Sequence, residues 1–208
     1  MSIAKDGWPY VCGLALATAA AWFWSPIAAA FLGALCLFVL FFFRDPDRTA
    51  PGGAGLVVSP ADGRVVRAES PGGGSEPGQV SIFLSIFNVH VNRSPVAGQI
   101  QSVQYYPGAF RAAFDHRAST DNEQNVVTVR GDGHEIVFKQ IAGLIARRIV
   151  FWKRPSDSVT RGERVGLIKF GSRCDVVVPP GSSLLVKVGD RVRAGESVLA
   201  QLPGANGR

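Results

Sequence analysis

A stretch of 34 residues without a charged side chain, from Tyr10 to Phe43, limits the possible folds of this chain more than any other feature. As a single helix it would extend about 51 Å, whereas the hydrocarbon core of a bilayer is roughly 30 Å thick. Pro26 lies near its middle, and proline interrupts a helix because it lacks an N–H and clashes with the preceding turn. We therefore predict two short helices, about Tyr10–Trp24 and Ile27–Phe43, joined by a tight turn.

Both predicted helices are short for crossing a bilayer, so a shallow hairpin and two tilted spans both remain open. Aromatic residues occur near the helix ends, where amphipathic rings favour the headgroup region. A cleaved signal peptide fits poorly, because the uncharged stretch is too long and no small-x-small cleavage site follows it. Residues 1–43 are therefore predicted to form a membrane-anchoring helical hairpin.

Lys5 precedes the uncharged stretch, and Arg44 and Arg48 follow it. A hairpin would bring all three to one side of the membrane, and basic flanking residues favour the cytoplasmic side. We expect the protein at the cell membrane, with the domain that follows the hairpin on its cytoplasmic side.

The chain from Arg44 onward has 21 basic and 15 acidic residues, so the net charge of +6 belongs to this part. A basic domain beside a membrane anchor favours anionic membrane lipid as a partner. Nucleic acid is disfavoured, because basic residues are not interleaved with aromatic ones.

The cysteines and histidines indicate neither a disulfide framework nor a metal site. Cys12 and Cys36 lie in the uncharged stretch and Cys174 stands alone, which fits a reducing compartment. The three histidines, at positions 90, 116 and 134, have no cysteine pair beside them and lack metal-ligand spacing. We therefore expect no metal.

The remainder of the chain predicts a mainly β domain. Residues 44–55, RDPDRTAPGGAG, are rich in Pro, Gly and charge and are predicted to be a linker to a domain at 56–208. Short β-branched runs separated by Gly and Pro then favour an antiparallel β-sandwich or barrel. A short helix is predicted at 145–153. The predicted strands are 56–58, 63–68, 80–83, 98–106, 126–130, 135–142, 164–169, 174–178, 183–186 and 197–201.

Two segments share one rhythm of strand, tight turn and strand: VVSPADGRVVRA and VKVGDRVRAGESVLAQL. The second resembles the closing half of lipoyl- and biotinyl-type modules, which makes the expected fold similar to a barrel-sandwich hybrid. Those modules carry their cofactor on a lysine in a hairpin commonly flanked by methionine. Here the only methionine is Met1, so a swinging-arm carrier is disfavoured.

Three further segments, taken in order, resemble one enzyme family. They are VSPADGRV at 58–65, FNVHVNRSPVAG at 87–98 and GLIKFGSRCDVVVP at 166–179. Together they resemble phosphatidylserine decarboxylases of the short bacterial and archaeal type, and the resemblance runs from about Phe42 to residue 201. Better-known members have LGST where this chain has FGSR, so the Gly-Ser pair is kept and its neighbours differ. On local grounds alone, Asp62 would be a turn former and His90 a core histidine.

The resemblance implies a triad of Asp62, His90 and Ser172 and self-cleavage at Gly171–Ser172. Ser172 Oγ would attack the carbonyl of Gly171 while His90 takes the proton and Asp62 steadies the imidazolium. Glycine at 171 would leave room for this acyl shift and can adopt a strained turn. The products would be a β chain, 1–171, and an α chain, 172–208, that begins with a pyruvoyl group.

The same resemblance implies the second reaction. Phosphatidylserine would form a Schiff base with the covalent pyruvoyl cofactor derived from Ser172, lose CO₂ and leave as phosphatidylethanolamine, which is a step of phospholipid biosynthesis. The implied partners are phosphatidylserine, anionic membrane lipid and the two chains of the protein itself. The sequence leaves the oligomeric state open, including a homo-oligomer.

Two other functions remain open from the residues. One is a membrane-tethered, non-enzymatic β-sandwich adaptor, although no heptad run for a coiled-coil hairpin occurs between residues 70 and 180. The other is a pyruvoyl-dependent decarboxylase of another amino compound, although a soluble substrate would not require the apolar N-terminus.

Overall fold

The computed structural model describes residues 2–72, 76–111, 117–131, 133–143, 148–169 and 171–204. The chain divides into two compact units, Met1–Asp47 and Arg48–Arg208. Each unit is described by itself.

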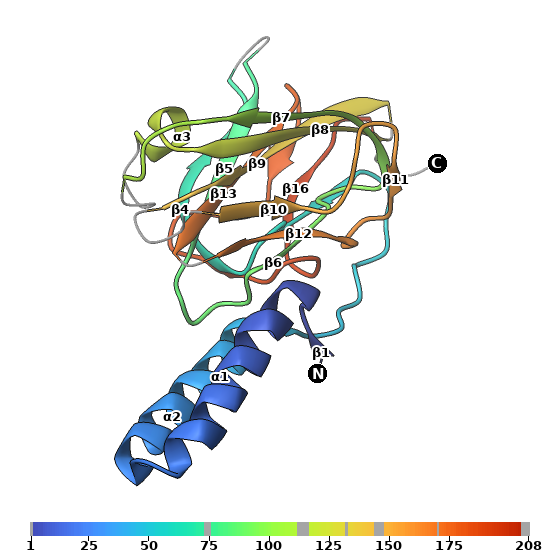
Figure 1. Cartoon of the computed structure of the whole chain (residues 1–208). Helices are drawn as coiled ribbons and strands as arrows, with labels where there is room; N and C mark the ends of the chain where they lie inside the picture. Colours follow the sequence, from blue (N-terminus) through green and yellow to red (C-terminus); the bar gives the residue numbers. More distant parts are fainter. Residues whose placement is uncertain are drawn as a thin grey trace. The chain divides into compact units, whose positions relative to one another are not determined.

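The first unit is an antiparallel pair of helices (Figure 1), as the sequence predicts. It contains β1 (Ser2–Ile3), the 3-10 helix η1 (Lys5–Gly7), α1 (Trp8–Trp22), α2 (Pro26–Phe42) and β2 (Arg44–Asp45). The Oγ of Ser25 accepts a hydrogen bond from the backbone N of Ala28 at 3.3 Å and so caps α2. Pro26 is the first residue of α2, where a missing N–H costs nothing. β1 and β2 pair antiparallel, so β2 lies within the segment predicted as a linker.

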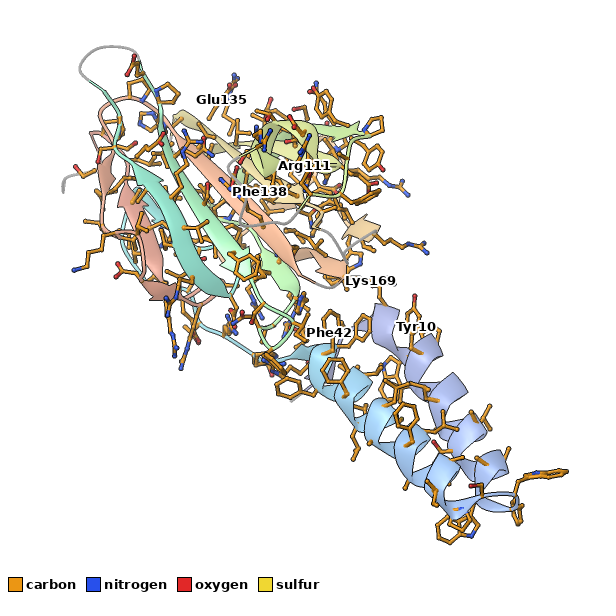
Figure 2. All side chains as sticks on the ribbon, turned by 90° about the vertical axis from the view of Figure 1, so that its left-hand side faces the viewer. Tyr10, Phe42, Arg111, Glu135, Phe138 and Lys169 are labelled. Carbon is orange, nitrogen blue, oxygen red and sulfur yellow. The ribbon has the colours of Figure 1, made fainter. Side chains whose placement is uncertain are left out.

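The helix pair carries large apolar side chains on its surface (Figure 2). Phe23, Trp24 and Ile27 are 84 to 89% exposed around the turn, and Phe31 and Leu37 are exposed farther along α2. Such a continuous apolar surface is unusual outside an interaction site and suggests membrane association. Among the described residues, no helix is long and apolar enough to cross a membrane.

The second unit is built of antiparallel sheets (Figure 1), which confirms the mainly β fold expected from the sequence. One sheet has eight strands in the order β11-β7-β8-β9-β13-β5-β4-β15 and curls into a half-barrel. Two three-stranded sheets, β10-β12-β6 and β14-β16-β3, complete the unit together with the short α3 (Ala118–Asp121). The strands are β3 (Leu56–Val58), β4 (Gly63–Glu69), β5 (Gly78–Leu84), β6 (Val91–Arg93), β7 (Gly98–Tyr106), β8 (Gln124–Gly131), β9 (His134–Ile141), β10 (Arg148–Phe151), β11 (Ser158–Val159), β12 (Arg164–Lys169), β13 (Ser172–Val178), β14 (Ser183–Leu184), β15 (Arg191–Val192) and β16 (Val198–Gln201).

All three sheets contribute side chains to one hydrophobic core. Ile82 and Val176 come from the large sheet, Val165 and Ile168 from β12, and Leu199 from β16. Their relative exposure is at most 1%. Because successive residues of a strand face opposite sides, the remaining positions of the same strands are free to carry polar groups.

The two segments with the shared rhythm pair with each other in space. β15 pairs with β4, and β16 pairs with β3, both antiparallel. The turn after β3 and the turn between β15 and β16 are also hydrogen-bonded to each other. Ser59 N donates to Ser197 O at 2.8 Å, and Gly195 N donates to Ser59 O at 2.7 Å. The C-terminal segment is therefore hydrogen-bonded along its length to the segment that carries Asp62.

The helix predicted at 145–153 is wrong, because Arg148–Phe151 form β10, antiparallel to β12. Residues 145–147 lie outside the described residues. The segment has too few residues for a clear helical period, and pairing with β12 decides its conformation. The strands β6, β11 and β15, each of two or three residues, were not among those predicted from the β-branched runs.

Gly63, the first residue of β4, allows a close approach between β4 and β5. A Cβ on Gly63 would lie 2.1 Å from the carbonyl oxygen of Phe83. We predict that Gly63→Ala destabilises the protein by about 1–3 kcal/mol, because backbone atoms must shift to relieve the overlap. Thermal unfolding measures this, with Gly52→Ala as control, since a Cβ on Gly52 meets nothing within 4 Å. Equal melting temperatures for the two variants would contradict the prediction.

Candidate active site

Ser172 begins β13 and lies opposite Leu84 of β5. From Arg173 onward β13 also pairs with β9, so it is an interior strand of the eight-stranded sheet. Gly171 has a φ of 41°, in the left-handed region that favours glycine. A Cβ at this position would meet nothing within 4 Å, so the backbone conformation, and not crowding by neighbours in the folded chain, favours glycine here.

The hydroxyl of Ser172 is in an unusual state for a buried polar group. Ser172 is 0% exposed, and its Oγ has no hydrogen-bond partner among the described residues. Leaving such a group unpaired costs about 1–3 kcal/mol, so native proteins rarely retain one without a reason. A buried serine with no competing hydrogen bond is ready to give its proton to a base that approaches it.

His90 immediately precedes β6 and is 2% exposed. Its Nδ1 lies 2.9 Å from the backbone carbonyl oxygen of Asn88. A carbonyl oxygen can only accept, so this contact favours the tautomer of a neutral ring with the proton on Nδ1. Nε2 then carries the lone pair and is the nitrogen that can act as a base.

Asp62 lies in the turn between β3 and β4 and is 9% exposed. Arg48 binds its carboxylate with both terminal nitrogens, and the distance from Nη2 to Oδ2 is 2.8 Å. The backbone N of Ala194 donates to Oδ1 at 2.8 Å. The sequence expectation pairs Asp62 with the imidazole, whereas these bonds tie the carboxylate to Arg48 and to the turn after β15.

Asn92 connects the three segments that carry these candidates. Its Nδ2 lies 3.4 Å from the carbonyl oxygen of Pro60 and 3.4 Å from Cys174 Sγ, and its Oδ1 accepts from Gln140 Nε2 at 3.0 Å. Asn92, Cys174 and Gln140 are all 0% exposed. Burial, together with the nearby charge of Asp175, raises the pKa of the Cys174 thiol, so this thiol stays neutral.

Asn92 and two of its partners, Cys174 and Pro60, each lie two positions from a candidate residue. Asn92 follows His90 by two, Cys174 follows Ser172 by two, and Pro60 precedes Asp62 by two. Residues two apart in β13 share one face, so Ser172 faces the same side of the sheet as Cys174. The network therefore brings together the three segments that the sequence singled out.

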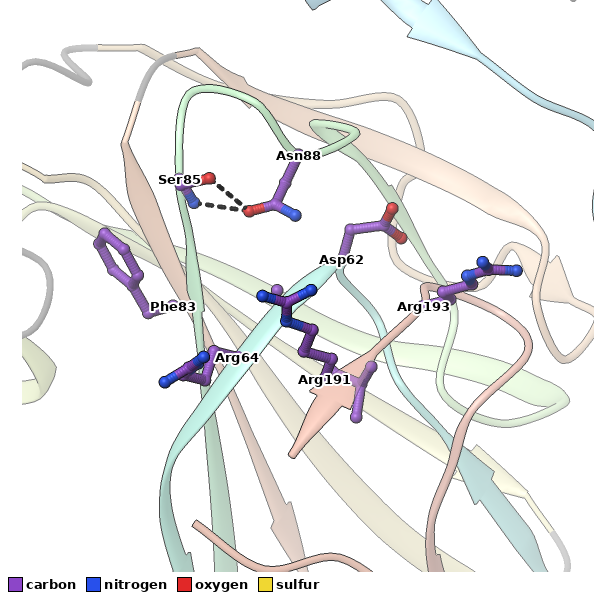
Figure 3. Close-up of a pocket in the computed structure, with 9 residues that line it drawn as sticks. Asp62, Arg64, Phe83, Ser85, Asn88, Arg191 and Arg193 are labelled. Carbon is purple, nitrogen blue, oxygen red and sulfur yellow. Dashed lines mark hydrogen bonds between the residues drawn. The ribbon is translucent and has the colours of Figure 1, made fainter. Parts of the chain in front are cut away.

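A pocket of about 430 Å³ opens on the Asp62 side of this network (Figure 3). The N and Oγ of Ser85 both donate to Asn88 Oδ1, at 2.9 and 2.7 Å, and fix one wall of the pocket. This wall includes Asn88, whose backbone carbonyl contacts the His90 ring. The pocket is lined by Asp62, Gly63, Arg64, Phe83, Ser85, Asn88, Arg191, Val192 and Arg193.

A buried ion pair anchors β13 on the face opposite the candidate serine. Arg173 Nε lies 2.6 Å from Asp175 Oδ1, and the two side chains are 1% and 0% exposed. Arg173 also donates to Ser81 Oγ at 2.7 Å. The other oxygen of Asp175 accepts from Ser119 Oγ at 2.6 Å and from Gln79 Nε2 at 3.0 Å.

Sequence reasoning missed the functional environment of the candidates: Arg48, Asn92 and the Arg173–Asp175 pair. A signal existed for Arg173, because it is one of the two positions at which the chain departs from the LGST motif. No local signal marks Arg48, which pairs with a carboxylate 14 positions away. Phe170 and His116 lie outside the described residues.

Comparison with known proteins gives one consistent family. A sequence model of the family described as phosphatidylserine decarboxylase matches residues 35–200. The phosphatidylserine decarboxylase proenzyme of Solibacter usitatus is 54% identical over 202 residues, which cover 97% of each protein. Those of Symbiobacterium thermophilum and Polynucleobacter asymbioticus are 48% and 45% identical, and in both cases cover 97% of this chain and 96% of the relative.

We predict that Asp175→Asn destabilises the fold by about 3–5 kcal/mol, because it leaves the buried Arg173 guanidinium without its carboxylate. Urea unfolding measures the change. The control is Glu135→Gln, which removes the exposed ion pair of Arg130 and Glu135 and should cost no more than about 1 kcal/mol. Similar losses in the two variants would show that the buried pair does not anchor β13.

Proposed function

Because this chain belongs to the phosphatidylserine decarboxylase family, we propose that Ser172, His90 and Asp62 carry out its self-cleavage and serve its decarboxylation site. The chain has the function of a phosphatidylserine decarboxylase proenzyme, a lyase zymogen of phospholipid biosynthesis, and the cofactor of its family is a pyruvoyl group formed from a serine. The observation that carries the assignment to Ser172 is its buried, unpaired hydroxyl directly after a left-handed glycine.

In the proposed cleavage, Ser172 Oγ attacks the carbonyl carbon of Gly171 and its proton passes to His90 Nε2. The Asn88 carbonyl at Nδ1 supports this role, because it fixes the tautomer in which Nε2 is basic. The amide becomes an ester, with the freed α-amino group on residue 172. Elimination across Cα–Cβ of residue 172 then releases Gly171 as a carboxylate, and water converts the remaining dehydroalanine to the pyruvoyl group and ammonia.

Asp62 has an electrostatic role in this proposal. The proposal requires the Asp62 carboxylate to face the imidazole during cleavage, where its charge would favour the protonated ring that appears while the ring holds the serine proton. Arg48 and the N–H of Ala194 hold the carboxylate in one orientation. This arrangement limits the cost of burying the charge, since a buried carboxylate without partners would be strongly unfavourable.

The residues around position 172 fit a pyruvoyl group. The Ser172 side chain has no hydrogen bond that would be lost on its conversion, among the described residues. Leu84 opposite and Cys174 on the same face give the group an apolar, buried setting. When formed, a pyruvoyl group supplies the electron sink for loss of CO₂ from an amino acid. His90 would hold or deliver the proton that replaces the lost carboxylate.

After cleavage, the two chains are proposed to remain associated without a covalent bond. Residues 172–178 pair with β5 on one side and, from Arg173, with β9 on the other. β15 and β16 pair with β4 and β3. These pairings would all join residues 172–208 to residues 1–171.

For location, we propose the cell membrane with the catalytic domain on the cytoplasmic side and residues 1–43 as the anchor, followed by a linker at 44–55 and the catalytic domain at 56–208. The exposed apolar surface of the helix pair supports the anchor. A lipid substrate also supports an anchor, because the anchor would hold the catalytic domain close to the membrane lipids that the domain converts.

We predict that the wild-type protein separates into fragments 1–171 and 172–208, whereas Ser172→Ala remains one chain. Denaturing electrophoresis and mass spectrometry of the small fragment test this, and the fragment should begin with a pyruvoyl group. His90→Ala should slow cleavage about 10²- to 10⁴-fold, because it removes the base. His134→Ala is the matched control, because His134 lies at the start of β9 and contacts the carbonyl of Pro203.

A wild-type preparation that is active on phosphatidylserine yet remains a single intact chain would refute the proposal. Cleavage of Ser172→Ala at the same bond would also refute it. Equal cleavage rates for His90→Ala and His134→Ala would remove His90 from the reaction.

We also predict that Phe31→Asp and Leu37→Asp each lower the partition of the protein onto anionic lipid vesicles by about tenfold or more. Burying one such side chain contributes about 1.5–3 kcal/mol, and a charge at the same place opposes insertion. Vesicle sedimentation measures the bound fraction. Val188→Asp, which replaces an exposed apolar residue of the second unit, should bind as the wild type does. Unchanged binding of both helix variants would exclude the helix pair as anchor.

A further inference from the structure

Arg64 and Arg191 form a pair of like charges in the eight-stranded sheet. They lie directly opposite each other where β4 and β15 pair antiparallel. Residues at such positions extend their side chains on the same face, with Cβ atoms about 5 Å apart. Like charges placed in this way destabilise a sheet unless an anion lies between them.

No carboxylate of the described residues forms an ion pair with Arg64 or Arg191. Other arginines of the same region differ in this respect. Arg67, three positions along the chain, pairs with Glu69, and Arg48 is bound to Asp62. Because Arg48 already compensates Asp62, the pocket retains the positive charge of Arg64 and Arg191.

Both arginines line the same pocket as Asp62, with Asn88 on the facing wall (Figure 3). The Oδ1 of Asn88 accepts two hydrogen bonds from Ser85, so its amide nitrogen is left to donate to a ligand. Its backbone carbonyl contacts the His90 ring. A ligand held by the arginines would therefore lie beside Asp62 and beside Asn88, the lining residue that contacts the His90 ring.

We propose that Arg64 and Arg191 bind the phosphodiester of the substrate lipid and so orient its serine group toward His90 and residue 172. This inference rests on the proposed function of the site. A phosphodiester has one negative charge and two non-bridging oxygens that accept hydrogen bonds, and guanidinium groups match that geometry. The pocket volume of about 430 Å³ lies in the range of small-molecule sites and suits a headgroup.

The phosphodiester fits this pair better than the carboxylate of the serine group does. The carboxylate loses its charge as CO₂ leaves, so arginines bound to it would stabilise the substrate more than the transition state. The phosphodiester keeps its charge throughout the reaction. Binding it holds the substrate in place without opposing the chemistry.

The test uses the full-length, self-cleaved protein and dihexanoyl phosphatidylserine as dissolved monomers, so that no membrane is present. Arg64→Gln and Arg191→Gln should each raise KM about fivefold, and the double variant about 25-fold, with kcat changed by less than about twofold. Arg64→Lys and Arg191→Lys should recover part of the loss. Arg154→Gln, which removes the same charge from another exposed arginine, should match the wild type.

Further measurements distinguish binding of the lipid phosphodiester in the pocket from binding of phosphate groups at a membrane surface. With an O-alkyl serine ether, which lacks phosphate, wild type and variants should have equal kcat/KM. Inorganic phosphate should compete with the lipid in the wild type and in Arg154→Gln, and less in the pocket variants. Normal KM for monomers combined with weaker binding of the variants to phosphatidylglycerol vesicles would assign the arginines to the membrane surface and overturn the proposal.

The outcome also distinguishes this inference from the proposed function. All pocket variants should self-cleave fully, because the arginines have no part in serinolysis. A wild type that cleaves and decarboxylates, with pocket variants indistinguishable from Arg154→Gln, overturns the phosphodiester site alone. A wild type that does neither overturns the proposed function as well.

Discussion

The antiparallel pairing of β13 with strands on both sides is the interaction on which the site depends. It holds the backbone from residue 172 onward in register with β5, and from residue 173 with β9, so the hydroxyl of Ser172 that is proposed to react has a defined position. The strand is anchored on one face by the buried Arg173–Asp175 pair and on the other by the core. Such support allows a buried hydroxyl to remain unpaired, because the neighbouring structure compensates its cost.

The same pairing would hold the two proposed fragments together after cleavage between Gly171 and Ser172. A covalent bond between Gly171 and Ser172 contributes little to the position of β13 once both of its edges are bonded to strands that precede the bond. The left-handed conformation of Gly171 also separates the end of β12 from the start of β13 at that point. The left-handed glycine and the bond proposed to break thus meet at the edge of the sheet, while the pairing of β13 itself remains regular.

Two buried carboxylates in and beside the site each have a compensating arginine. Arg48 compensates Asp62, and Asp175 compensates Arg173. Asn92 links three backbone segments through neutral hydrogen bonds, which cost less to bury than charges. The exposed pair Arg64 and Arg191 departs from this pattern, because neither arginine forms an ion pair with a carboxylate of the described residues. An anionic ligand in the pocket would supply the missing negative charge.

The sequence by itself determined the helix pair, the mainly β domain, the family and the candidates Gly171, Ser172, His90 and Asp62. These follow from local patterns: an uncharged stretch broken by proline, short β-branched runs, and motifs of a few residues. Strands of six or more residues, such as β7 and β12, were predicted from the sequence because their residue pattern is long enough to be recognised.

The tertiary structure alone decided the rest. The short strands β6, β11 and β15, the strand in place of a helix at 148–151, the pairing of Arg48 with Asp62 and the position of Arg64 opposite Arg191 all depend on residues far apart in the chain. Contacts of that kind are fixed by register and packing between segments, and no local period in the sequence records them.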